Sequence, residues 1–251
     1  MLVVDVGNTR IKFGRCSASG VERAASLSDD PDAWRNQLSE WRLEGPQEWV
    51  LAGVDPKRRD RLAEWLRQTG HQVRVLDHFS QVPLPLAIDS PETVGIDRLF
   101  NVLAAKGQVP PGTPAVVVDV GTAVTVNLLD ESGAFAGGAI FPGPRLMAES
   151  LHDNTAALPL VNLAEQPTLV PAKSTLPAIA AGIHWAVVGG VAALVRELHR
   201  CVPSAEPLQV FLTGGDAAAI EPDLPDRDLY HYELRPKLTL EGIRLAAGPT
   251  E

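Results

Sequence analysis

The sequence predicts an α/β protein built from two duplicated lobes with a central cleft. Three observations favour this fold class: strand patterns alternate with helix patterns, one short motif occurs twice, and a proline-rich stretch precedes the second copy. The chain has 251 residues, 45% of them apolar, which is enough to bury one large core or two modest ones. The duplicated motif favours two cores, one in each lobe.

The repeated motif is a β-branched apolar run that ends in Asp-x-Gly, at residues 2–9 and again at 116–123. Each copy predicts a buried strand, a tight glycine turn and a returning strand, with the returning strands at about 10–16 and 124–129. Each turn therefore offers backbone N–H groups beside an acidic side chain. Backbone donors bind phosphate, and a neighbouring carboxylate holds a cation.

The first half of the chain reads as an α/β lobe, because apolar alternation predicts strands and 3.6-residue spacing predicts helices. The strands lie at about 2–6, 10–16, 48–53 and 72–76, and the helices near 31–43, 57–69 and 91–106. The stretch Pro110–Pro114 then interrupts the chain just before the second Asp-x-Gly strand. We therefore expect lobes at 1–113 and 114–251.

The second lobe repeats the order of strand, turn and strand. Its strands are predicted at 115–120, 124–129, 134–140 and 209–213, the last of them followed by a glycine turn and a short helix. The longest helix is predicted over roughly 175–200, opening at Ser174 or Thr175. Gly189 and Gly190 within it mark a place where another segment packs closely.

The composition argues against several classes of function. A formal net charge of −9 argues against a nucleic-acid partner, because binding a polyanion needs a basic surface. We expect no targeting leader and no apolar stretch of membrane-spanning length, which predicts a soluble cytoplasmic protein without a membrane partner. Cys16 and Cys201 lack close partners and the histidines show no ligand spacing, so neither a disulfide framework nor a zinc site is indicated.

The first glycine turn predicts a phosphate site in concrete terms. Gly7 lets the backbone approach a phosphate closely, and Asn8 and Thr9 offer side-chain donors. Lys12 follows on the returning strand, where its ammonium reaches the same phosphates. Asp5 then faces Mg²⁺ through water. The alternative is a plain β-hairpin in which the Asp and Asn only make turn hydrogen bonds.

The second copy of the motif favours the phosphate site over the plain hairpin. Asp119 and Thr122 recur in the same context of strand and turn. Two such turns that face each other across a cleft would hold one triphosphate from both sides.

A third segment, residues 90–98, carries groups for catalysis. Ser90 as N-cap and Pro91 as first helical residue predict a helix start, which places Asp97 on the early turns, where the helix dipole favours its ionised form. Gly95 leaves room for a ligand, and Arg98 offers a planar fork to a substrate carboxylate. An ionised Asp97 can accept a proton from a hydroxyl. The alternative is an Asp–Arg pair on a solvated helix face.

Taken together, these segments resemble the type III pantothenate kinases, of the acetate/sugar kinase, Hsp70 and actin superfamily, over most of the chain. Residues 5–12 resemble the family's first phosphate motif, 95–98 its Gly-x-Asp-Arg substrate motif and 119–123 its second phosphate motif. Further segments that resemble the family are 137–143, 155–159, 174–175 and 212–215. The resemblance implies two actin-like, ribonuclease H-like lobes.

The resemblance also implies an activity, the ATP-dependent phosphorylation of the 4′-hydroxyl of pantothenate on the way to coenzyme A. Asp97 is then the general base, and Asp119 ligates a monovalent cation, K⁺ or NH₄⁺, beside the Mg²⁺ that accompanies ATP. The implied ATP-binding residues are Asp5, Val6, Gly7, Asn8, Thr9, Arg10, Ile11, Lys12, Thr122, Gly214 and Gly215. The implied substrate-binding residues are Ile88, Gly95, Ile96, Asp97, Arg98 and Thr175.

A homodimer is implied as well, with the helix near 175–200 as candidate interface; the alternative for that helix is an ordinary core helix. One position departs from the family, because Ile88 stands where members commonly have Tyr. Two other functions remain open: a nucleotide-binding regulatory module without turnover, and a related kinase or phosphatase for another substrate. The intact Gly-x-Asp-Arg sequence favours the kinase, since a module without an acceptor hydroxyl has no use for a base.

Overall fold

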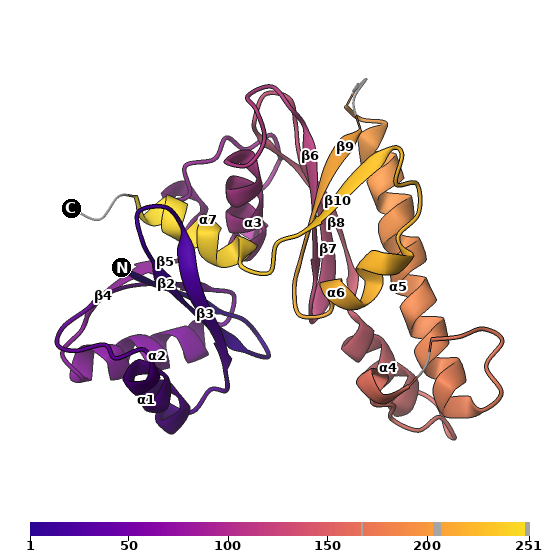
Figure 1. Cartoon of the computed structure of the whole chain (residues 1–251), viewed down its shortest axis with the longest axis horizontal. Helices are drawn as coiled ribbons and strands as arrows, with labels where there is room; N and C mark the ends of the chain where they lie inside the picture. The colour runs from indigo at the N-terminus through magenta and orange to yellow at the C-terminus, as the bar shows by residue number, and fades with distance from the viewer. Residues whose placement is uncertain (167, 203–206, 249–251) are drawn as a thin grey trace. The chain divides into compact units, whose positions relative to one another are not determined.

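The computed structural model describes residues 1–166, 168–202 and 207–248. It divides into two compact units (Figure 1). The first unit comprises Met1–Pro110 together with the C-terminal segment from Lys237, and the second comprises Pro111–Pro236. The expected second lobe, 114–251, included that C-terminal segment, so the expected division differs from the observed one at this end of the chain.

The first unit contains a five-stranded mixed sheet in the order β3-β2-β1-β4-β5. Its central strand, β1, pairs antiparallel with β2 and parallel with β4. The strands are β1 (Leu2–Val6), β2 (Ile11–Cys16), β3 (Val21–Leu27), β4 (Glu48–Gly53) and β5 (Gln72–Leu76). The strand β3 was not predicted: most of its residues are exposed or half-buried, and its sequence lacks a clear apolar alternation.

Helices cover both faces of this sheet (Figure 1). On one face α1 (Pro31–Glu40) and α2 (Pro56–Gln68) bury an apolar core that includes Val4 and Val6 of β1. On the other face lie α3 (Ile96–Lys106) and α7 (Leu238–Ala247). Gly14 of β2 makes room there, since a Cβ on it would lie 3.3 Å from Leu240 of α7. Alternate residues of β1 therefore face different helix layers.

The second unit repeats this topology. Its sheet order is β10-β9-β6-β7-β8, so a central strand again has an antiparallel hairpin on one side and parallel strands on the other. The strands are β6 (Ala115–Val120), β7 (Ala123–Leu129), β8 (Phe135–Pro142), β9 (Leu208–Thr213) and β10 (Tyr230–Leu234), and the helices are α4 (Pro144–Asp153), α5 (Thr175–His199) and α6 (Ala217–Ile220). The predicted duplication of an α/β lobe is confirmed.

The long helix α5 corrects one expectation from the sequence. By length and composition α5 is apolar enough to cross a membrane, whereas no such stretch was expected. Half of the most apolar stretch of α5 is buried inside the unit. There Val187 and Val191 join the core beneath β6 and β7. The expected close packing is confirmed at Gly190, where a Cβ would lie 3.3 Å from Phe141. At Gly189 a Cβ would meet nothing within 4 Å.

Candidate active site

The first glycine turn joins β1 to β2 through residues 7–10. The N–H of Gly7 donates to the carbonyl of Arg10 at 3.1 Å, which closes the turn. Asn8, Thr9 and Arg10 are exposed beyond this bond. The Gly7 N–H thus serves the turn itself, and the exposed tip is the part that can face a ligand.

Asp5 and Lys12 lie on the same face of the sheet beside this turn. They are register partners on the antiparallel strands β1 and β2, and partners in an antiparallel pair point to the same side. Val4 and Val6, the neighbours of Asp5, belong to the core under α1 and α2. Asp5 and Lys12 therefore face the other layer, the one that contains α3 and α7.

The helix α3 carries Asp97 as its second residue, so the expected place of Asp97 at a helix start is confirmed. The expected start itself is wrong: Pro91–Thr93 form a separate 3-10 turn, and the side chain of Ser90 makes no capping bond. Val94 is extended and Gly95 is the N-cap of α3. The chain cannot continue as one helix through an extended residue.

The Asp97 carboxylate is oriented by its own helix. Its Oδ1 accepts a hydrogen bond from the N–H of Arg98 at 2.9 Å, within the first turn of α3, where the helix dipole favours a negative charge. A Cβ on Gly95 would lie 2.6 Å from the same Oδ1. Burial lowers the pKa of the half-buried Arg98, and Asp97 raises it; the guanidinium stays charged at neutral pH.

The end of β4 brings the α3 start to the first glycine turn. The N–H of Val54 donates to the carbonyl of Val6 at 3.2 Å, directly before Gly7. A Cβ on Gly95 would lie 3.9 Å from Cγ1 of Val54, so the two residues are neighbours. The start of α3, with Asp97, therefore lies beside the Gly7 turn at the carboxyl end of β1 and β4, the edge where open α/β sheets bind ligands. Lys12 follows this turn near the start of β2, as the register partner of Asp5.

In the second unit the corresponding edge gathers around Asp119. Asp119 lies one residue before the end of β6, beside Thr213 of β9. Gly214 follows with φ of +96°, and a Cβ there would lie 2.5 Å from Oδ1 of Asp119 and 2.3 Å from the carbonyl of Val120. Glycine is required at this position for two reasons: a Cβ would clash with these two oxygens, and L residues rarely adopt that φ.

Three further contacts complete this second edge. The N–H of Gly121 donates to the carbonyl of Ala123 at 3.1 Å, which closes the turn that contains Thr122. The N–H of Gly143 donates to the carbonyl of Thr122 at 3.0 Å. A Cβ on Gly143 would lie 2.0 Å from the carbonyl of Gly121, so only glycine fits there. The β8–α4 junction thereby holds the second turn in place.

Oxygen atoms at this edge fit a cation. The hydroxyl of Thr213 is buried and has no hydrogen-bond partner within residues 1–166, 168–202 and 207–248. It sits on the strand next to Asp119. The backbone N–H of Asp216 donates to the carbonyl of Val120 at 3.0 Å. Burial raises the pKa of the Asp216 side-chain carboxyl. A carboxylate, a hydroxyl and nearby carbonyls are hard oxygen ligands.

Two predicted substrate residues are not joined to these edges by a contact. Thr175 is the exposed first residue of α5, and the first turns of α5 pack against α4. Ile88 is half-buried in a bend before the 3-10 turn at Pro91. Of the predicted site, the first unit brings the Gly7 turn beside the Gly95–Arg98 segment. The second unit, by itself, brings the Gly121 turn beside Asp119 and Gly214. Among the described residues, no hydrogen bond or ion pair joins Thr175 or Ile88 to these segments.

Sequence reasoning missed several residues that support the turns. Arg58 of α2 donates to the carbonyl of Gly7, and the N–H of Asp216, after the Gly214–Gly215 turn, donates to the carbonyl of Val120. The sequence indicates Gly143 only as part of the segment 137–143 that resembles the family. Arg58 stands in a short basic run, 57–59, between Asp55 and Asp60, which was a signal, but periodicity alone does not link it to a residue 51 positions away.

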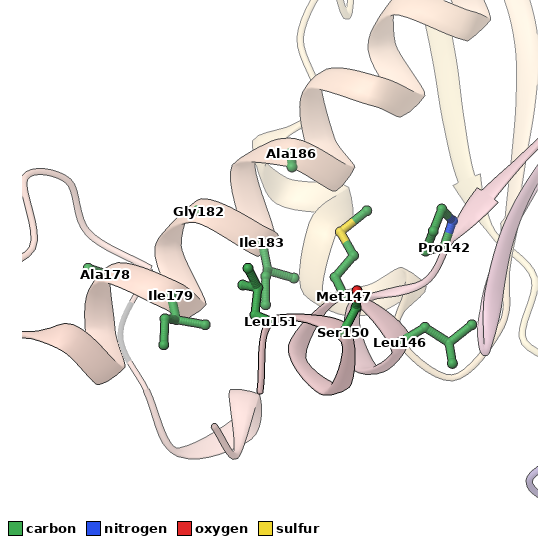
Figure 2. A pocket seen from close by; sticks show the side chains of 10 residues that line it. All are labelled: Pro142, Leu146, Met147, Ser150, Leu151, Ala178, Ile179, Gly182, Ile183 and Ala186. Atoms are coloured by element: carbon green, nitrogen blue, oxygen red, sulfur yellow. The ribbon is translucent and has the colours of Figure 1, made fainter. Parts of the chain in front are cut away.

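An apolar hollow of about 680 Å³ lies between α4 and α5 in the second unit (Figure 2). Met147 and Leu151 of α4 and Ile183 of α5 point toward one another across it. Its lining residues are Pro142, Leu146, Met147, Ser150, Leu151, Ala178, Ile179, Gly182, Ile183 and Ala186. A hollow lined almost wholly by apolar side chains lacks the charged groups that phosphate requires, so it is distinct in kind from the two turns.

Comparison with known proteins identifies relatives along the whole chain. The sequence matches the family model of type III pantothenate kinase over residues 1–197. It is 32% identical to the type III pantothenate kinase of Moorella thermoacetica, in an alignment that covers 98% of this chain and 97% of that protein.

Solved structures show the same fold at much lower identity. The activator of the 2-hydroxyisocaproyl-CoA dehydratase from Clostridium difficile with bound ADPNP has a TM-score of 0.55 at 14% identity, over 98% of this chain and 93% of that one. MreB 5 of Spiroplasma citri bound to AMPPNP has a TM-score of 0.51 at 11% identity, over 97% of this chain and 94% of that one. With the duplicated sheets, these likenesses confirm the actin-like fold.

Proposed function

Because the chain belongs to the type III pantothenate kinase family, we propose that Asp97, Lys12 and the two glycine turns carry out the family's reaction in this protein. That reaction is the ATP-dependent phosphorylation of pantothenate in coenzyme A biosynthesis. The observation that supports these roles best is that the α3 start with Asp97 lies beside the Gly7 turn, which joins the strands that carry Asp5 and Lys12.

Asp97 acts as the general base. Its carboxylate accepts the proton of the 4′-hydroxyl while that oxygen forms a bond to the γ-phosphorus of ATP and the bond from the γ-phosphorus to the bridging oxygen breaks, releasing ADP. The position of Asp97 in the first turn of α3 keeps the carboxylate ionised and ready to accept. Arg98 is the group proposed to bind the pantothenate carboxylate.

The glycine turns bind the phosphates. Phosphoryl transfer needs positive charge and hydrogen-bond donors around the equatorial oxygens, with little covalent chemistry from the protein. Lys12 supplies charge and the exposed residues 8–10 supply donors at the first turn, while Thr122 supplies a donor at the second. Gly214 and Gly215 form the next turn beside Asp119 and are proposed to approach the nucleotide.

Cations are assigned to the two acidic residues of the repeated motif. Asp5 is proposed to hold Mg²⁺ through water, and Asp119 is proposed to ligate a monovalent cation, K⁺ or NH₄⁺. The buried Thr213 hydroxyl on the strand beside Asp119 supports the second assignment. When bound, these cations neutralise the charge that develops on the phosphate oxygens.

We also propose a cytoplasmic homodimer. The helix α5 is apolar on all sides, but only half of its most apolar stretch is buried. A second apolar face of α5 is therefore left to be covered by another surface. Leu146 of α4, Leu176 and Trp185 of α5 and Ile140 of β8 are exposed apolar side chains of the same unit. A second copy of the chain that covers α4 and α5 removes these side chains from water.

The decisive experiment measures ADP release with pantothenate and compares wild type with Asp97→Asn. Asn cannot accept the proton, so we expect turnover to fall by about a hundredfold or more, while Kd for ATP and pantothenate stays within about threefold. Near-wild-type turnover in Asp97→Asn would reject the assignment of the base. Parallel assays with glycerol and glucose, with and without K⁺, test which alcohol is the acceptor. This is tested separately because Ile88 stands where family members commonly have Tyr.

A further inference from the structure

The side chain of Arg58 reaches the first glycine turn from the opposite side of the sheet. The helix α2 begins after Asp55, whose Oδ1 accepts from the N–H of Arg58 at 3.2 Å. From this first turn of α2, Nη1 of Arg58 donates to the carbonyl oxygen of Gly7. The contact therefore joins the start of a core helix to the turn that is proposed to bind ATP.

The guanidinium of Arg58 is itself held in place. Its Nε lies 3.3 Å from Oδ2 of Asp29, and the Arg58 and Asp29 side chains are only 16% and 23% exposed. A mostly buried ion pair restricts the conformations of the Arg58 side chain more than a solvent-exposed pair does. Arg61, one turn later on α2, also reaches Asp29, at 3.4 Å, but its side chain is 53% exposed.

The contact fixes the orientation of one peptide unit. In a trans peptide the C=O of one residue and the N–H of the next point in opposite directions within one rigid plane. Arg58 binds the Gly7 carbonyl from the α2 side of the sheet, so the N–H of Asn8 points away from α2. That is the side of Asp5 and Lys12.

Without this contact the peptide is free to rotate. Gly7 has no Cβ, so its backbone dihedrals are the least restricted in the turn. A flipped peptide presents the Gly7 carbonyl to the phosphates instead of the Asn8 N–H, which replaces an attraction by a repulsion. A residue that prevents the flip prepares the turn for an anion before the anion arrives.

We propose that Arg58, held by Asp29, is a positioning residue of the ATP site, which fixes the Gly7–Asn8 peptide so that the Asn8 N–H faces the phosphates. This inference rests on the proposed role of the Gly7 turn in ATP binding. Arg58 itself lies on the other side of the sheet and does not touch the nucleotide.

The test compares Arg58→Met with Arg61→Met. Both substitutions remove a guanidinium from Asp29 and keep an unbranched side chain, but only Arg58→Met removes the hydrogen bond to Gly7. Calorimetry with AMPPNP gives Kd, steady-state assays give KM for ATP and for pantothenate, and thermal unfolding gives Tm.

For Arg58→Met we expect Kd for AMPPNP and KM for ATP to rise about tenfold, with KM for pantothenate unchanged. Arg61→Met should stay within about twofold of wild type in all three. Arg58→Lys keeps the positive charge, but one ammonium replaces the planar fork that reaches Asp29 and Gly7 from separate nitrogens, so a rise of a fewfold in KM for ATP alone is expected. This second variant carries the test if Arg58→Met does not fold.

Nucleotide affinity equal to that of Arg61→Met in the Arg58 variants would overturn the inference, as would a parallel rise of KM for both substrates. The proposed function survives those results, because it depends on wild-type turnover and on Asp97→Asn. Failure of the wild-type protein to bind AMPPNP overturns both.

Discussion

At the scale of single residues, Gly95 is the position on which the orientation of Asp97, the proposed base, depends most directly. A Cβ there would lie 2.6 Å from Oδ1 of Asp97, much closer than a carbon and an oxygen can approach. The atom in the way is the end of a side chain and not backbone, so the clash is relieved by moving the carboxylate. The fold should therefore tolerate the change better than catalysis does.

The first prediction follows from this contact. We expect Gly95→Ala to lower kcat by about tenfold or more, because a base displaced by an ångström loses alignment, while Tm changes by less than about 3 °C. Steady-state kinetics and thermal unfolding measure the two effects. A loss of Tm as large as the loss of kcat would show that Gly95 serves folding and not the position of Asp97.

The second prediction concerns the two thiols. Burial, with a smaller contribution from Glu241, raises the pKa of Cys16 from 9.0 to about 11. Because the thiolate is the reactive form, a raised pKa means less thiolate at pH 8, and reactivity is gained only as the pH approaches 11. We expect iodoacetamide to modify the exposed Cys201 at least about tenfold faster than Cys16 at pH 8, by peptide mass spectrometry. Equal rates in the folded protein would contradict this, and urea should remove the difference.

Much of the candidate site could be predicted at this scale, because its residues lie within short segments. Asp5, Lys12 and Gly7 belong to one hairpin, whose register follows from the spacing of the strands. Gly95 and Asp97 are likewise two positions apart. Arg58 could not be predicted, since its bond to Gly7 depends on how α2 packs on the sheet and not on local spacing.

At the scale of elements, α7 is the helix that ties the end of the chain to α3, the carrier of Asp97. Thr239 donates to Oδ1 of Asn101 at 2.8 Å, and both side chains are buried. A Cβ on Gly242 would lie 2.0 Å from the carbonyl of Phe100. The two helix backbones thus touch at Gly242, which leaves no room for any side chain.

The third prediction tests this helix contact. We expect Gly242→Ala to lower the free energy of unfolding by about 3 kcal/mol, because the clash is with backbone and the helices must separate. The control is Gly189→Ala in α5, where a Cβ meets nothing within 4 Å and the higher helix propensity of Ala should stabilise the protein by about 0.5–1 kcal/mol. Urea unfolding measures both. Equal effects of the two substitutions would refute the close contact.

The elements divide into those that local patterns predict and those that they do not. The strands β1, β4 and β6 are nearly continuous apolar runs and were predicted within a residue. The 3-10 turn at Pro91–Thr93 was read as part of α3 because Ser-Pro is a common helix start. The helix α7 was missed, and its place in the first unit depends on Gly242 meeting Phe100, 142 positions earlier in the chain.

At the scale of the whole molecule, the two units share one sheet topology but differ in the residues that surround the glycine turn after the central strand. Each sheet ends its central strand in an acidic residue and a closed glycine turn. The first unit adds a helix start that carries Asp97, the proposed base, whereas the second adds the Gly214 turn and a buried hydroxyl at Thr213. Under the proposed function, the duplication supplies one phosphate-binding turn in each unit, while the proposed base is a feature of the first unit and the proposed monovalent-cation site a feature of the second.

The fourth prediction concerns assembly. If a second copy covers α4 and α5, light scattering after gel filtration should give twice the 26.8 kDa mass of the chain. Leu146→Lys places a charge at the hollow between these helices and should shift the mass toward one chain, because an unpaired buried charge opposes association. Leu229→Lys is the matched control, since Leu229 is also exposed in the second unit but does not line the hollow. A wild-type protein that is monomeric and floats with liposomes would contradict this prediction, and would show that a lipid surface covers α5 instead of a second copy.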